Sequence, residues 1–201
     1  MNQGIGCILL AAGQSRRFGG DKRQARLSSG ATLLEASLER YRRVFDDLIL
    51  VLRPDEAGPT GVQALVVQAR DAALGMGHSL AAGAREARVR HWSGAFVALA
   101  DMPFVTTNTL VTLKQTLQEH LEAARPTVVV QPVLRVSDGT DQPGHPVGFS
   151  ADLLPELEAL QGDSGARDVV RRHAQHRVIV PVDDPGVLQD VDRPDQLPRV
   201  T

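Results

Sequence analysis

Short runs of aliphatic residues alternate along the chain with longer stretches in which apolar residues recur every three or four positions. The short runs predict strands at residues 6–10, 48–52, 65–68, 95–100, 127–133 and 178–182. Several of them are apolar at every position, which is typical of strands covered on both faces. The periodic stretches predict helices at residues 32–44, 79–88, 107–121, 151–159 and 165–173. Thr107 is the expected N-cap of the third helix.

This alternation of strands and helices indicates an α/β protein. We expect a three-layer αβα, Rossmann-like arrangement with a mostly parallel central sheet. The length of 201 residues favours one domain over residues 1–201. Residues 53–61 and 137–144 are predicted loops, the second being rich in Gly, Asp and Pro. In folds of this class, ligands bind beyond the carboxyl ends of the strands.

Composition and charge exclude several classes of function. The chain has 42% hydrophobic and 23% charged residues, a formal net charge of −2 and only 3% aromatic residues. Neither nucleic acid nor a membrane surface is therefore an expected partner. With no apolar stretch of about 18 residues and no signal-like N-terminus, we expect a cytoplasmic protein. The single cysteine, Cys7, lies in an apolar run and is expected in the core.

The first strand leads into an unusually basic turn, in the sequence CILLAAGQSRRFGGDKRQARL. Small residues around Gly13 leave the backbone accessible, and successive N–H groups in a turn form a nest for anions. Arg17 and Lys22 add charge that suits a polyphosphate. The Walker loop and the dinucleotide fingerprint both need glycine spacings that this stretch lacks. The stretch favours a nucleotide-phosphate loop, and a solvated basic turn is the alternative.

The same stretch, read from Leu10 to Lys22, is similar to the signature LAAGxSxRMGxxK, with Phe18 in place of Met. That signature belongs to the MobA-like nucleotidyltransferases, and the resemblance extends to their molybdenum cofactor cytidylyltransferase (MocA-type) branch. Five later segments resemble the branch in the same order, so the likeness covers nearly the whole chain: GMGHSL, LADMPF, GHPVGF, GDSGAR and DVDRPDQL. The resemblance implies a nucleotidyltransferase fold and activity.

Two acidic segments are the candidates for a metal site. Asp101 follows an apolar strand, where a carboxylate is well placed for a divalent cation, or for capping the next turn. The resemblance implies that Asp101 and Asp190 bind Mg²⁺. Strand alternation would place Asp190 and Asp192 on one face. Either is a possible second ligand, and Asp192 has the alternative of capping the turn before Pro194.

The resemblance also implies the binding residues. Lys22, Arg17 and Asp101 would be catalytic, and the nucleotide would contact Leu10, Ala11, Ala12, Gly13, Lys22, Gly77, Ser79 and Asp101. His145 and Arg167 would bind the acceptor. The alternatives are structural: Gly77 as a packing glycine, Ser79 as a helix N-cap and Arg167 as an ordinary residue of a first helical turn, with Asp163 as a possible cap of that helix.

The reaction implied is the transfer of CMP from CTP to the phosphate of molybdenum–molybdopterin, with release of pyrophosphate. Ala12, in place of the glycine found in GTP-using relatives, narrows the pocket and favours the smaller base. Two alternatives remain: transfer to another phosphorylated small molecule, and a non-catalytic escort of the cofactor. A recipient molybdoenzyme is a possible partner.

Overall fold

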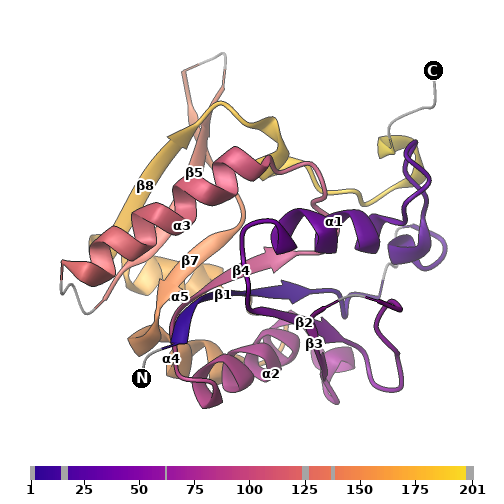
Figure 1. Ribbon diagram of the computed structural model, residues 1–201, viewed down its shortest axis with the longest axis horizontal. Coiled ribbons are helices and arrows are strands. Elements are labelled where there is room, and N and C mark those ends of the chain that lie inside the picture. The colour runs from indigo at the N-terminus through magenta and orange to yellow at the C-terminus, as the bar shows by residue number, and fades with distance from the viewer. Residues whose placement is uncertain (1–2, 15–17, 62, 124–126, 137–138, 198–201) are drawn as a thin grey trace.

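The computed structural model describes residues 3–14, 18–61, 63–123, 127–136 and 139–197, and these residues form one mixed sheet with helices on both faces (Figure 1). The strands follow the order β3-β2-β1-β4-β7-β5-β6, and β8 also pairs with β5. Their bounds are Gln3–Leu10 (β1), Leu48–Leu52 (β2), Leu65–Gln68 (β3), Trp92–Leu99 (β4), Val129–Arg135 (β5), Asp141–Pro143 (β6), Val147–Ser150 (β7) and Arg177–Val182 (β8).

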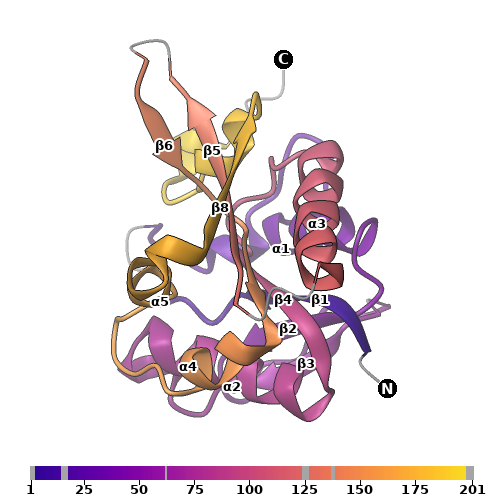
Figure 2. The same ribbon diagram turned by 90° about the vertical axis from the view of Figure 1, so that its left-hand side faces the viewer.

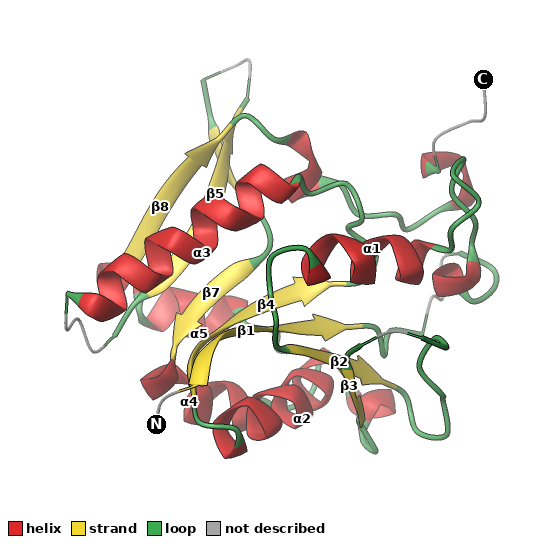
Figure 3. Ribbon diagram, viewed as in Figure 1, coloured by secondary structure: helices red, strands yellow, loops and turns green. Residues whose placement is uncertain are grey.

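Strands β1 to β4 form the parallel part of the sheet. β1 pairs with β2 and β4, and β2 pairs with β3, all in parallel register. Their carboxyl ends therefore meet at one edge, where the arrows of β1, β2 and β4 end in Figure 3. β7 and β6 run antiparallel to their neighbours, whereas β8 runs parallel to β5.

Figure 2 shows the helices as two layers, one on each side of the sheet. Helices α1 (Leu33–Arg42) and α3 (Thr107–Glu122) cover one face. Helices α2 (Met76–Val89), α4 (Leu154–Glu158) and α5 (Arg167–Arg172) cover the other. None of the described helices is long and apolar enough to span a bilayer.

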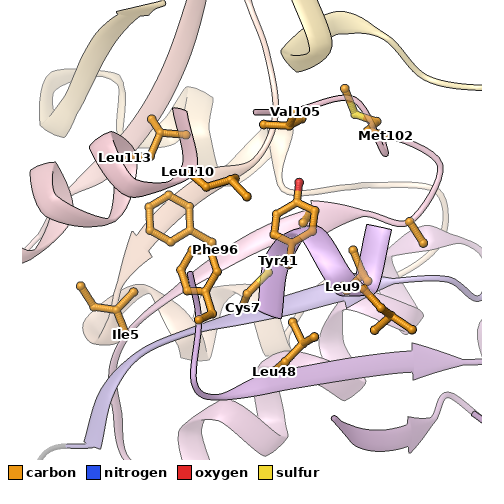
Figure 4. Packing of buried hydrophobic residues seen from close by; sticks show 14 of the residues in the cluster. Ile5, Cys7, Leu9, Tyr41, Leu48, Phe96, Met102, Val105, Leu110 and Leu113 are labelled. Carbon is orange, nitrogen blue, oxygen red and sulfur yellow. The ribbon is translucent and has the colours of Figure 1, made fainter. Parts of the chain in front are cut away.

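Alternation along the strands divides the core between the two faces of the sheet. In β1, Cys7 and Leu9 pack toward α1 and α3, whereas Ile8 packs toward α2. Figure 4 shows the first of these clusters, in which Tyr41 and Phe96 lie among aliphatic side chains. Cys7 is fully buried, and burial raises the pKa of its thiol. The expected core position of Cys7 is confirmed.

The α/β class and the mixed, mostly parallel sheet agree with the sequence expectation, but several local details differ. Thr106, not Thr107, caps α3, since its side-chain oxygen accepts from the backbone N–H of Thr109. Helix α2 begins at Met76, so Ser79 lies inside the first turn and is not its N-cap. Asp163 does not cap α5, whose N-cap is Ala166. Residues 139–144, expected to be loop, include the short strand β6.

Candidate active site

A cavity of about 530 Å³ opens at the carboxyl ends of β1 and β4. Its walls come from the end of β1, the first turn after it, the start of α2 and two acidic segments. The lining residues that carry polar or ionisable side chains are Gln14, Lys22, Arg23, Ser79, Asp101, Asp163, Asp190 and Asp192. Leu10, Ala11, Ala12 and Gly13 form the floor. The volume lies within the range of small-molecule sites.

Lys22 links the signature turn after β1 to both acidic segments, the one with Asp101 and the one with Asp190 and Asp192. Its ammonium donates to Asp101 Oδ2 at 2.6 Å and to Asp192 Oδ1 at 3.0 Å. Burial alone would lower the pKa of Lys22, but the two carboxylates outweigh it and raise that pKa above its ordinary value. Lys22 therefore stays charged at neutral pH. Residues distant in the sequence thus meet at one point of the cavity.

The two acidic segments are tied together through their backbones. The N–H of Val191 donates to the carbonyl of Asp101 at 2.9 Å. Val191 is buried, and its neighbours Asp190 and Asp192 both line the cavity. These residues do not form a strand, so the expected strand alternation is wrong although the shared location is observed. Nor does Asp192 cap the last turn, where the N-cap position belongs to Arg193.

Asp184 fixes the start of the second acidic segment. Its buried carboxylate accepts from Thr106 N–H at 2.8 Å, Thr106 Oγ1 at 2.9 Å, Thr109 Oγ1 at 2.7 Å and Gly186 N–H at 3.0 Å. Thr106 follows the loop that carries Asp101, and Gly186 precedes Asp190. Sequence reasoning missed Asp184, because its two threonine partners lie more than 70 positions away in the chain. Its local signal is that of a capping aspartate: Asp184 precedes Pro185 at the start of a short helical turn and accepts from the N–H of Gly186.

The segment before α2 and the first turn of α2 also line the cavity. Gly75 has φ +130°, and a Cβ there would come within 2.2 Å of Gly162, so a glycine is required. Gly77 also packs against the loop between α4 and α5, which contains Gly162: the N–H of Gly77 donates to the carbonyl of Gly162 at 2.8 Å. Ser79 is among the described residues that line the cavity, whereas Gly77 is not. Leu74 and Met76, which sequence reasoning missed, also line it and are 63% and 48% exposed.

The acceptor candidates lie beside the cavity and are not among its described lining residues. His145 is close enough to Asp101, Asp190 and Arg167 for all three charges to affect its pKa. Burial is the largest effect and lowers that pKa, so the imidazole is neutral at pH 7. Arg167 is the first residue of α5. Arg17 falls outside the described residues.

Comparison with protein families gives a specific match. Residues 7–178 match the sequence model of the MobA-like NTP transferase domain. The chain belongs to this family. The matched region of this MobA-like chain includes the first turn and Asp101, whereas Asp190 and Asp192 lie beyond it.

Two named proteins are similar to this MobA-like chain. Purine catabolism protein PucB of Bacillus subtilis (strain 168) is 28% identical over 209 residues, covering 96% of this chain and 94% of PucB. The molybdenum cofactor guanylyltransferase of Desulfosudis oleivorans is 27% identical over 122 residues, covering 59% of this chain and 57% of that enzyme.

Solved structures extend the likeness over the whole fold. Rv0371c from Mycobacterium tuberculosis H37Rv is 28% identical, with a TM-score of 0.68 and coverage of 98% of this chain and 96% of that one. A complex of Rv0371c with manganese is 27% identical, with a TM-score of 0.64 and coverage of 96% and 95%. The chain therefore has an α/β nucleotidyltransferase fold, and a related structure binds a divalent metal.

Proposed function

We propose that this chain transfers CMP from CTP to the phosphate of molybdenum–molybdopterin and releases pyrophosphate. One observation carries the proposal: Lys22 contacts Asp101 and Asp192 at a cavity that Asp190 also lines. A cation from a phosphate-binding turn beside several carboxylates suits a nucleoside triphosphate bound with a divalent metal. Membership of the MobA-like family supports the reaction class.

The residues present fit Mg²⁺. Asp101 Oδ1 is buried without a hydrogen-bond partner in the described part of the chain, as expected of an oxygen reserved for a ligand. No group of three or more acids, histidines or cysteines among the described residues is arranged to hold a metal. The protein would therefore supply a carboxylate pair, Asp101 with Asp190 or Asp192, which is the usual number for Mg²⁺. A bound Mg²⁺ supplies Lewis-acid stabilisation of phosphate charge.

In the proposed reaction, the protein mainly positions the reactants. A phosphate oxygen of the acceptor attacks the α-phosphorus of CTP in line, and the bond from that phosphorus to the β-phosphate oxygen breaks. Lys22 exchanges its carboxylate partners for phosphate oxygens and neutralises the charge that develops on the leaving pyrophosphate. Backbone from Leu10 to Gly13 borders the nucleotide, and Ser79 contacts the base.

His145 and Arg167 would bind the acceptor in this scheme. Because His145 is neutral at pH 7, it contributes a hydrogen bond and not a positive charge. Arg167 has the planar guanidinium fork that pairs with a phosphate. A phosphate nucleophile is already ionised, so the reaction needs no strong general base.

The choice of CTP rests on Ala12, whose buried methyl group lines the cavity. The similarity to a molybdenum cofactor guanylyltransferase makes GTP the competing nucleotide. A methyl group in place of hydrogen disfavours the larger purine by about 1–3 kcal/mol.

The test is a pyrophosphate-release assay with each NTP, Mg²⁺ and either molybdenum–molybdopterin or other phosphorylated acceptors. We expect release with CTP and the molybdopterin acceptor. Release with another acceptor alone would replace the proposed substrate, and nucleotide binding without release under any combination would favour an escort protein. For a substitution of Asp190 or Asp192 in this assay, Asp195→Asn is the matched control, because Asp195 is an exposed acid of the same segment and is not among the described residues that line the cavity.

A further inference from the structure

Arg23, the residue after Lys22, is a buried arginine in the wall of the cavity. Its exposed fraction is only 8%. An arginine in such a place is normally interpreted as a phosphate ligand. The contacts of Arg23 contradict that interpretation, because protein oxygens already occupy its guanidinium.

The guanidinium has five N–H donors, and each has an acceptor. Nε donates to Asp21 Oδ1 at 2.8 Å, and one terminal nitrogen donates to Asp21 Oδ2 at 2.6 Å. The terminal nitrogens also form a paired contact with the two carboxylate oxygens of Glu56. The remaining donor reaches the carbonyl of Ala11 at 3.1 Å. Arg23 therefore has no donor left for a phosphate.

These contacts join three segments that are separate in sequence. Ala11 directly follows β1 and lines the cavity, Asp21 belongs to the signature turn, and Glu56 lies in the loop after β2. Arg53, the first residue after β2, strengthens the third segment: its N–H and Nε donate to Glu56 at 3.1 and 2.8 Å. Hydrogen bonding to Arg23 lowers the pKa of Glu56 to about 2, so Glu56 is ionised at neutral pH.

We propose that Arg23 is a positioning residue for nucleotide binding: it holds the Ala11 carbonyl in the cavity floor and orients the adjacent Lys22 toward Asp101. This inference rests on the proposed function. It assigns Glu56, a residue outside the cavity lining, an effect on nucleotide affinity through Arg23. Lys22 is adjacent in the chain, so any rotation of the turn at Arg23 displaces its ammonium relative to the carboxylates.

The chain offers a matched control for Glu56. Glu158 also accepts from two arginines, with Arg85 Nε at 3.0 Å and Arg88 Nε at 2.7 Å. The side chains of Glu56 and Glu158 are similarly exposed, at 24% and 20%. Glu158 belongs to α4 and does not line the cavity. Glu56→Gln and Glu158→Gln therefore each weaken the ion pairs of one glutamate with two arginines. The first change lies beside the cavity wall, and the second lies away from the cavity.

The experiment compares wild type, Glu56→Gln, Arg23→Lys and Glu158→Gln by calorimetric titration with Mg–CTP and by thermal melting. We expect Glu56→Gln and Arg23→Lys to weaken nucleotide binding about tenfold, the usual scale for residues that support a binding group. Lysine keeps the charge of Arg23 but lacks the planar fork that reaches three segments at once. Glu158→Gln should bind Mg–CTP with the affinity of wild type, even if its melting temperature falls as much as that of Glu56→Gln.

Each outcome has a distinct meaning. Wild-type affinity in both Glu56→Gln and Arg23→Lys, or equal loss of affinity in Glu158→Gln, would overturn the positioning role while leaving the proposed function intact. Loss of folding in Arg23→Lys would leave Glu56→Gln to decide. Failure of the wild-type chain to bind any NTP with Mg²⁺ would instead overturn the proposed function and the inference with it.

Discussion

At the scale of single residues, the two carboxylate oxygens of Asp101 have different environments. One carboxylate oxygen bonds Lys22, and the other is buried without a partner in the described part of the chain. A buried carboxylate oxygen without a partner costs stability in the absence of a ligand, because its desolvation is not offset by a hydrogen bond. Such a cost at a cavity wall is typical of a functional residue.

Asp101→Asn should reduce turnover by about a hundredfold to a thousandfold, the scale expected when a charge-stabilising group is lost from a transition state. The amide keeps the volume of the carboxylate, so the fold should remain intact. Pyrophosphate release gives the rate, and circular dichroism checks the fold. Full activity in this variant would remove Asp101 from the metal site.

Ala12 tests the steric explanation of base choice. Ala12→Gly removes the methyl group from the cavity wall and should raise the ratio of GTP to CTP use by about 10-fold or more. The ratio of kcat/KM values for the two nucleotides is the measurement. A ratio identical to that of wild type would show that another contact selects the base.

At the scale of elements, the site depends on how two loops are held together. Asp184 links the N-terminus of α3 to the turn that precedes Asp190, through four hydrogen bonds. His145 N–H adds a bond to the carbonyl of Val187 at 2.9 Å in that same turn. The positions of the acids thus depend on residues that do not touch the cavity.

Asp184→Ala should destabilise the fold by about 3 kcal/mol, because it leaves several buried donors without an acceptor. Urea denaturation measures the loss. Asp183→Ala is the control: Asp183 is the exposed neighbour, and its removal should change stability by less than about 0.5 kcal/mol. Equal effects of the two substitutions would contradict the role of Asp184 as the joint between the loops.

Glu56 gives the ion network that surrounds Arg23 a definite pH dependence. The pKa of Glu56 is lowered from 4.5 to about 2 in the folded chain, mainly by its hydrogen bonds to Arg23. A lowered pKa means that the stabilisation is complete above pH 4.5 and disappears as the pH falls toward 2. The stability difference between wild type and Glu56→Gln, measured in urea, should therefore be larger at pH 7 than at pH 3. A difference that grows on acidification would contradict the network.

Sequence patterns predicted these elements unevenly, for physical reasons. The bounds Leu48–Leu52 and Leu65–Gln68 were predicted correctly, because both are short apolar runs that end at a polar residue or turn. The cap of α3 was misplaced by one residue, since Thr106 and Thr107 have the same capping chemistry. Strand β6 is exposed throughout and has no hydrophobic alternation to reveal it.

The whole molecule explains why residues from both ends of the chain meet. Parallel strands bring the end of β1 and the end of β4 to the same edge (Figure 3). Lys22 of the signature turn therefore contacts Asp101. The positions of the signature turn and of Asp101 follow from the sequence, because each comes directly after a predicted strand. The contact of Lys22 with Asp192 spans 170 positions and depends on the return of the chain after β8. No local pattern predicts such a contact.

The central claim is that Lys22, Asp101 and the acids at Asp190 and Asp192 form one site for a nucleoside triphosphate and a divalent cation. The most direct measurement is a crystal structure with CTP and Mn²⁺, in which anomalous scattering locates the metal. We predict a manganese peak within bonding distance of Asp101 and of Asp190 or Asp192, with Lys22 moved onto the phosphates. A nucleotide bound elsewhere, or a metal peak away from Asp101, would contradict the claim.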